Sequence, residues 1–151
     1  RCHFWEPAKT MRYLLSAILC CAAPVAWACT PELPASKTPG QKPQIVEAKQ
    51  YALAFRTQPE RIVIGQHFAV ELALCTKEGA AAPDSVRVDA HMPEHRHGMN
   101  YKTTVTRSGV GQYRAEGLMF HMPGRWEYIF EVRASGNSGA TERITTSVVL
   151  Q

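Results

Sequence analysis

The chain has 151 residues, a formal net charge of +4 at pH 7 and 45% hydrophobic residues, a size that fits one domain. If residues 1–28 are removed, as argued below, Arg1, Lys9, Arg12 and Glu6 go with them and the net charge falls to +2. A net charge this small, made up of charges of both signs, argues against binding to nucleic acid or to an anionic membrane.

The N-terminal region has the features of a secretory signal peptide. The first ten residues show no pattern, and we interpret them as an upstream extension before a true start at Met11. Arg12 supplies positive charge, residues 13–28 are nearly all apolar, and the sequence AWA ends this run as a small-x-small cleavage site. The run is shorter than the roughly 20 residues that span a membrane. We therefore expect an exported, periplasmic protein without a membrane span after processing. A retained membrane anchor is the alternative.

The segment after the cleavage site, residues 29–50, is expected to be a flexible tether, because it is rich in proline and poor in apolar residues. Cleavage after residue 28 makes Cys29 the first mature residue. Its side chain could be free, paired with Cys75 in an oxidising compartment, or modified with a lipid anchor. Trp27 makes a poor lipid-attachment signal, so simple secretion is favoured.

From Tyr51 onward, apolar and polar residues alternate with the period of a half-buried β-strand. Turn residues, mainly Gly and Pro, separate the alternating stretches. Seven strands are expected, at residues 51–57, 66–75, 85–91, about 101–106, 112–121, 126–134 and 141–150. Residues 51–151 are therefore predicted to form an all-β domain, a single immunoglobulin-like antiparallel β-sandwich. The alternation predicts that Trp126, Tyr128 and Phe130 contribute to its core.

The tripeptide His-Met-Pro occurs twice, at residues 91–93 and 121–123, and the first copy opens a loop that adds His95, His97 and Met99. Four of the five methionines and four of the six histidines lie between residues 91 and 122. Imidazole and thioether are good ligands for copper, and thioether favours Cu(I). The cluster predicts a copper site, with Cu(I) preferred over Cu(II) and zinc as the less favoured alternative.

The predicted topology brings the two copies together. The strands that end in them would run in the same direction in opposite sheets, so both copies would reach one pole of the sandwich. The candidate metal ligands are His91, His95, His97, Met99 and His121. Met92 and Met122 continue inward faces and are expected to close the core instead. The same alternation places His91 and His121 on the outward face. Gly98 is expected to provide the sharp turn that returns Met99 to the site. A purely structural role for both copies, with Pro and Gly ending strands, is the alternative.

At this point the chain resembles a known group. The segments DAHMPEHRHGM, GQYRAEGLMFHMPG and RWEYIFEV, within residues 85–132, are similar to the YtkA-like/FixH-like family of small exported β-sandwich domains. The resemblance implies a role in copper supply during haem–copper oxidase assembly, with a membrane metalloprotein or oxidase-assembly factor as partner. It also implies His91, His97, Met99 and His121 as the positions to consider.

The motifs of common enzymes are missing from the sequence. It contains no GxSxG elbow, no HExxH and no CxxC motif. No pair of carboxylates for general acid–base catalysis can be identified in it either. We therefore predict a binding protein and not an enzyme. The leading hypothesis is a periplasmic copper-binding or copper-delivery protein. The alternative is a metal-free interaction module that docks on an envelope complex.

Overall fold

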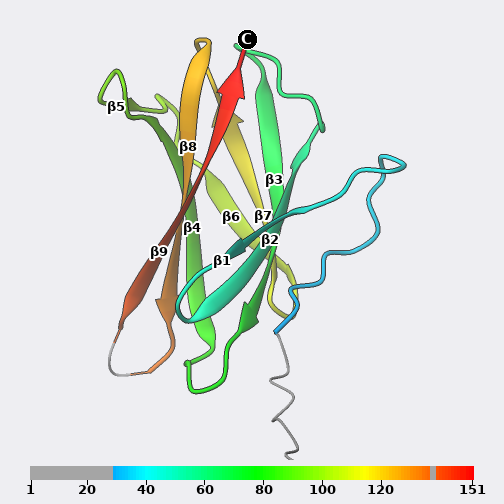
Figure 1. The fold of residues 1–151 in the computed structure, drawn as a ribbon, viewed down its shortest axis with the longest axis vertical. Coiled ribbons are helices and arrows are strands. Elements are labelled where there is room, and N and C mark those ends of the chain that lie inside the picture. The colour runs from blue at the N-terminus through cyan, green and yellow to red at the C-terminus, as the bar shows by residue number, and fades with distance from the viewer. Residues whose placement is uncertain (1–28, 137–138) are drawn as a thin grey trace, which may run out of the picture.

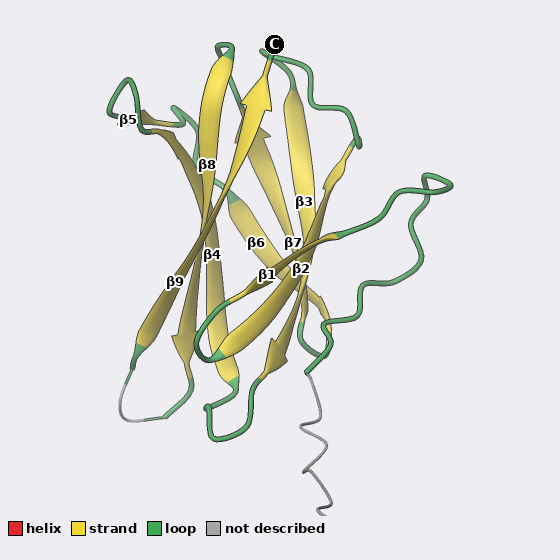
Figure 2. Cartoon of the chain, viewed as in Figure 1, coloured by secondary structure: helices red, strands yellow, loops and turns green. Residues whose placement is uncertain are grey.

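The computed structural model describes residues 29–136 and 139–151, and the expected signal peptide lies outside these residues. The described part of the chain is built from strands and loops (Figure 2). Within it, no helix is long and apolar enough to cross a membrane. The described strands are β1 (Gln44–Glu47), β2 (Tyr51–Gln58), β3 (His67–Thr76), β4 (Pro83–Met92), β5 (His97–Gly98), β6 (Thr104–Gly109), β7 (Gln112–Met119), β8 (Gly124–Ala134) and β9 (Thr141–Leu150).

The strands form two antiparallel sheets that pack face to face (Figure 1). Sheet A has the order β1-β2-β3-β7-β6, and sheet B has the order β5-β4-β8-β9. Without the short edge strands β1 and β5, this is the strand order of a seven-stranded immunoglobulin-like sandwich. The predicted fold class is confirmed, and the expected strands agree with the observed ones within a few residues at each end.

Two short strands differ from the sequence-based expectation. Strand β1 lies inside the segment expected to be a flexible tether and pairs with β2 through four residue pairs. Strand β5 has only two residues and pairs with the end of β4. Neither shows a clear period of two in the sequence, because four residues in a proline-rich stretch and two residues in a loop are too few for a pattern.

The N-terminal described segment is fastened to the outer face of sheet A. Cys29 forms a disulfide with Cys75, so of the three states considered for Cys29 the structure shows the paired one. The guanidinium of Arg56 donates to the Pro34 carbonyl at 2.8 Å, and the Arg56 side chain is 2.7 Å from the Glu71 carboxylate. This segment therefore contacts the domain at several points, although its composition predicts a loose tether.

The core lies between the inner faces of the two sheets. Its largest fully buried side chains include Trp126, Tyr128 and Phe130 from β8, as predicted from their alternation. Phe55 meets the rings of Tyr128 and Phe130 at centroid distances of 5.4 and 5.1 Å. Burying a large apolar side chain of this kind contributes about 1.5–3 kcal/mol. Burial also raises the pKa of the Tyr128 hydroxyl.

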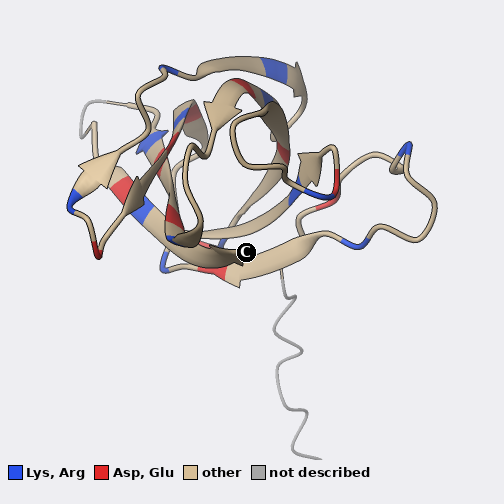
Figure 3. Cartoon of the chain, turned by 90° about the horizontal axis from the view of Figure 1, so that it is seen from above, with Lys and Arg blue, Asp and Glu red and all other residues tan. Residues whose placement is uncertain are grey.

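Charged residues are distributed over the rest of the molecule. Viewed along the sandwich, Lys and Arg are interspersed with Asp and Glu around its circumference (Figure 3). The exposed face of sheet B has Arg87 paired with Asp89 and Glu131, at 2.9 and 3.3 Å. Neither sign dominates, in agreement with the weak net charge expected from the sequence.

Candidate metal site at one pole

The β4–β5 hairpin and the β7–β8 turn, which carry the two His-Met-Pro copies, lie at the same end of the sandwich (Figure 1). The first copy ends strand β4 of sheet B, and the second copy lies in the turn that connects β7 of sheet A to β8 of sheet B. The imidazoles of His97 and His121 are 5.1 Å apart between ring centroids. The predicted meeting of the two segments at one pole is therefore observed.

The first copy forms the tip of a tight hairpin. His91 pairs with Gly98 and Met92 with His97, so the chain reverses over residues 93–96. The backbone N–H of His95 donates to the Met92 carbonyl at 3.2 Å, and Arg96 has a left-handed φ of 56°. The expectation of a sharp turn at Gly98 was wrong. Gly98 is a strand residue, and the reversal occurs before it.

This register places neighbouring histidines on opposite faces of sheet B. Directly paired residues of adjacent strands share a face, so His97 lies on the side of Met92, which is 0% exposed. His91 points to the outer side, where its Nε2 is 3.2 Å from Oε1 of Glu127. The structure therefore does not bring His91 to the side chains of His97 and His121.

The second copy forms the β7–β8 turn, and the first copy packs against it. Gly124 has a φ of +119°, and a Cβ at this position would lie 2.5 Å from Cε of Met92. The indole N–H of Trp126 donates to the Met122 carbonyl at 3.0 Å and closes the turn. Met92 therefore closes this end of the core, as predicted. Met122 is partly buried and packs against the core.

Three rings meet between the two copies, and we call His97, His121 and Trp126 the ring cluster. The imidazoles of His97 and His121 lie 5.8 and 5.2 Å from the indole of Trp126. Alternation had predicted that His121 points outward into solvent. The strand ends at Met119 instead, so the alternation does not extend to His121 and its ring turns toward the indole.

The ring nitrogens differ in their hydrogen bonds. Nδ1 of His97 is 3.0 Å from the Gly98 carbonyl, which can only accept, so Nδ1 is the donor, and Nε2 is the nitrogen that has the lone pair in the neutral ring. Histidines that bind metal commonly donate their other ring N–H to a carbonyl in this way. Nδ1 of His121 is buried and has no hydrogen-bond partner among the described residues. An unsatisfied buried nitrogen costs about 1–3 kcal/mol, unless a ligand occupies it.

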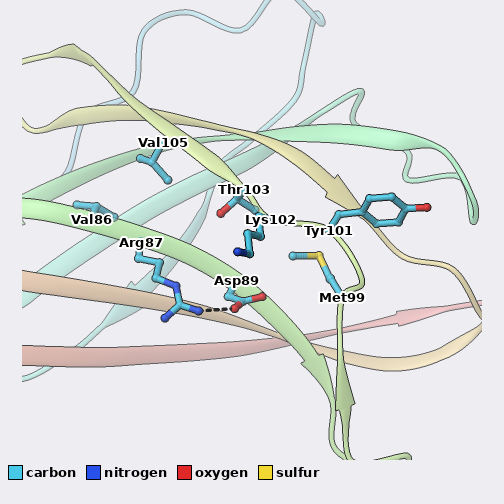
Figure 4. Close-up of a pocket in the computed structure, with 8 residues that line it drawn as sticks. All are labelled: Val86, Arg87, Asp89, Met99, Tyr101, Lys102, Thr103 and Val105. Carbon is cyan, nitrogen blue, oxygen red and sulfur yellow. Dashed lines mark hydrogen bonds and ion pairs between the residues drawn. The ribbon is translucent and has the colours of Figure 1, made fainter.

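His95 and Met99 lie outside the ring cluster. The His95 ring is exposed, at the tip of the hairpin, with its centroid 5.9 Å from that of His97. Met99 lines a separate cavity of about 650 Å³ between β4 and the chain leading to β6, whose lining includes none of the three rings. Figure 4 shows the Met99 thioether pointing into this cavity, toward Asp89 and Lys102.

The five candidate ligands are thus separated into distinct environments. Two imidazoles meet, one is exposed beside them, one is paired with Glu127 on the outer face, and the thioether lines its own cavity. Within residues 29–136 and 139–151, no group of three or more His, Cys, Asp or Glu side chains is arranged to hold a metal ion.

Sequence reasoning placed Trp126 in the core but missed its contact with both histidines. The spacing of the segment HMPGRW contains a usable signal, because Pro123 and Gly124 predict a tight turn between His121 and Trp126. A turn of this kind returns the chain within a few residues, so the two side chains can meet. The approach of His97 has no local signal, since His97 lies on β5 and reaches Trp126 of β8 across β4 of the same sheet.

Known proteins provide two points of comparison. The crystal structure of a DUF4426 family protein from Pseudomonas aeruginosa PAO1 is similar with a TM-score of 0.47 and 8% sequence identity, over 74% of this chain and 98% of that one. Among curated proteins, none matches this chain. The model of the family described as YtkA-like matches residues 45–131, which is more than half of the chain. The chain therefore belongs to the YtkA-like family.

Proposed function

We propose that this protein binds copper, as Cu(I), between His97 and His121 and delivers it to a membrane metalloprotein or oxidase-assembly partner in the periplasm. The observation that carries the proposal is the meeting of these two imidazoles, 5.1 Å apart between centroids, although one comes from the β4–β5 hairpin and the other from the β7–β8 turn. In this proposal the protein is a carrier and not an enzyme.

The ring separation suits two ligands of one ion. A metal–imidazole bond is about 2 Å long, so two imidazoles that share an ion have centroids no more than roughly 6 Å apart. His97 offers Nε2, because its Nδ1 faces the Gly98 carbonyl. His121 has a buried Nδ1 without a partner among the described residues, and a metal bond there would compensate its burial.

The same geometry favours Cu(I) over zinc. Structural zinc sites use four protein ligands, whereas Cu(I) is bound well by few, uncharged, soft ligands. The ring cluster presents two imidazoles and an indole, with the exposed imidazole of His95 beside them. We include His95 as a rim ligand, which is accessible to an incoming or departing ion. Met99 is not a ligand in this proposal, because its thioether lines a separate cavity.

Export is part of the proposal. A disulfide such as Cys29–Cys75 persists in oxidising compartments, and the periplasm is one of them. Mass spectrometry of the mature protein should give a chain that begins at Cys29 and lacks two hydrogens, as expected for an intact disulfide. A lipid adduct on Cys29, or a reduced cytosolic chain that begins at Met11, would contradict this part.

The copper site is tested by anaerobic Cu(I) titration in competition with a chromophoric chelator. His97→Ala and His121→Ala should each weaken Cu(I) binding by about 100-fold or more, and the double variant should lose little beyond either single one, because each change removes the same centre. His67→Ala is the matched control, since this exposed histidine contacts Tyr101 and not the ring cluster.

Two results would contradict the copper proposal. Additive losses in the double variant would indicate two separate weak sites. Binding that is unchanged in both single variants, or absent from the native protein, would remove the ring cluster as a copper site. The metal-free interaction module would then be the remaining function.

A further inference from the structure

We propose that Trp126 is a third contact of the ion, through the face of its indole, and that this contact makes the site selective for Cu(I) over zinc. The inference rests on the proposed copper function. It concerns a residue that offers no lone pair to a metal and therefore does not belong to any conventional ligand set. The observations that carry it are the three ring separations, the inclination of the rings and the support of the indole.

The three rings form a nearly regular triangle. The centroids of His97 and His121 are 5.1 Å apart, and they are 5.8 and 5.2 Å from that of Trp126. With a metal–nitrogen bond of about 2 Å, an ion lies roughly 3 Å from an imidazole centroid. The centre of the triangle is also about 3 Å from each corner. An ion bound to both imidazoles there would lie well inside the range of about 6 Å in which a cation is attracted to an indole.

The inclination of the rings agrees with this placement. The planes of His97 and His121 make angles of 70° and 78° with the indole plane. Phe120 stacks on Trp126 at 4.6 Å with an interplanar angle of 17°, so it covers one indole face, and the proposal places the ion over the opposite face. The negative potential over that face is where a cation is stabilised.

The indole is held in place independently of any ion. Trp126 is 0% exposed, its N–H donates to the Met122 carbonyl at 3.0 Å, and Phe120 supports one face. The ring therefore cannot turn away when an ion enters or leaves. A rigid aromatic wall beside two imidazoles stabilises a poorly hydrated monovalent ion. It supplies none of the further lone pairs with which zinc completes its coordination.

The test compares the full-length protein with Trp126→Phe, which keeps an aromatic ring for the stack with Phe120 but weakens the cation–π attraction. Cu(I), Ag(I) and Zn(II) are titrated in competition with chelators, and near-UV absorption, fluorescence and the indole N–H resonances are followed. The difference between the two proteins isolates Trp126 from Trp5 and Trp27. Far-UV circular dichroism checks the fold of the variant.

Cu(I) and Ag(I) should perturb the absorption, fluorescence and N–H resonance of Trp126 at one equivalent. In Trp126→Phe, Cu(I) affinity should fall by about threefold to tenfold and Zn(II) affinity by less than about twofold. If Cu(I) binds through the histidines without any Trp126 signal, the inference is wrong and the proposed copper function stands. Equal losses for Cu(I) and Zn(II) would show that Trp126 only positions the imidazoles. Absence of Cu(I) binding would overturn both proposals.

If Trp126→Phe does not fold, the measurements on the native protein still decide the matter. The indole N–H resonance of Trp126 is distinguishable by its strong protection from exchange, since this residue is fully buried and donates to the Met122 carbonyl. A shift of that resonance with Cu(I), and none with an equal amount of bound Zn(II), supports the contact. Equal shifts with both ions, or none with either, would rule it out.

Discussion

The two His-Met-Pro copies have the same sequence, but their residues have different roles. In the first copy the methionine is fully buried against Gly124, and His91 points outward to Glu127. In the second copy the histidine enters the ring cluster, and the Met122 carbonyl accepts the indole N–H of Trp126. The comparison shows that the repeated tripeptide indicates a position in the fold, the end of a strand at this pole. The repeat does not mean that the two copies have the same chemical role.

The largest expected effect separates the two methionines. Met92→Ala should lower the free energy of unfolding by about 2–5 kcal/mol, because a fully buried side chain leaves a cavity under the turn. Met122→Ala should cost about 1 kcal/mol or less, since this side chain is only partly buried. Chemical denaturation of both variants measures the difference. Equal losses of unfolding free energy would mean that the two methionines contribute equally to the core, and the contrast between the two copies would then be wrong.

The two histidines should differ in copper binding. His121→Ala should lower Cu(I) affinity by about 100-fold, which equals roughly 2.7 kcal/mol. His91→Ala should change it by less than about threefold, because the imidazole of His91 lies on the outer face beside Glu127. Competition titrations of the two variants provide the measurement. A large loss in His91→Ala would show that the hairpin rearranges on binding and turns His91 toward the ion.

The glycines of the two segments should respond differently to an added methyl group. Gly124→Ala should destabilise the fold by about 1–3 kcal/mol, because its φ is +119° and the new Cβ would meet Met92 at 2.5 Å. Gly98→Ala is the matched control. Its nearest atom would be the Ala90 carbonyl oxygen at 3.5 Å, so a change within about 0.5 kcal/mol is expected. Thermal melts compare them, and a harmless Gly124→Ala would contradict the close packing of the two copies.

The smallest effect concerns the outward contact of the first copy. Glu127→Gln removes the carboxylate next to His91, in a pair whose side chains are 33% and 25% exposed. A partly exposed pair contributes little, so the loss of stability should stay below about 1 kcal/mol and Cu(I) affinity should not change. Denaturant unfolding and the chelator titration check both statements. A clear loss of copper affinity would place the His91–Glu127 pair within the binding site after all.

The sequence predicted the architecture because its evidence is local. A period of two, broken by Gly and Pro, indicates strands and turns wherever they occur, and about seven such strands favour the sandwich. The two motif copies fall at strand ends in the predicted topology, so the shared pole could also be inferred. The docked segment after Cys29 could not, because its disulfide and its contacts with Arg56 join residues far apart in the chain.

The sequence by itself therefore determined the fold class, the strand ends and the presence of several metal-binding side chains near one pole. The tertiary structure decided which of these side chains meet. The hairpin register, set by a turn at Arg96 and not at Gly98, puts His91 and His97 on opposite faces of the sheet. Alternation assigns a face only where the strand continues, and β7 ends at Met119 before it reaches His121. Both imidazoles reach Trp126 because only β4 separates β5 from β8 in sheet B, and because the β7–β8 turn returns His121 to the indole.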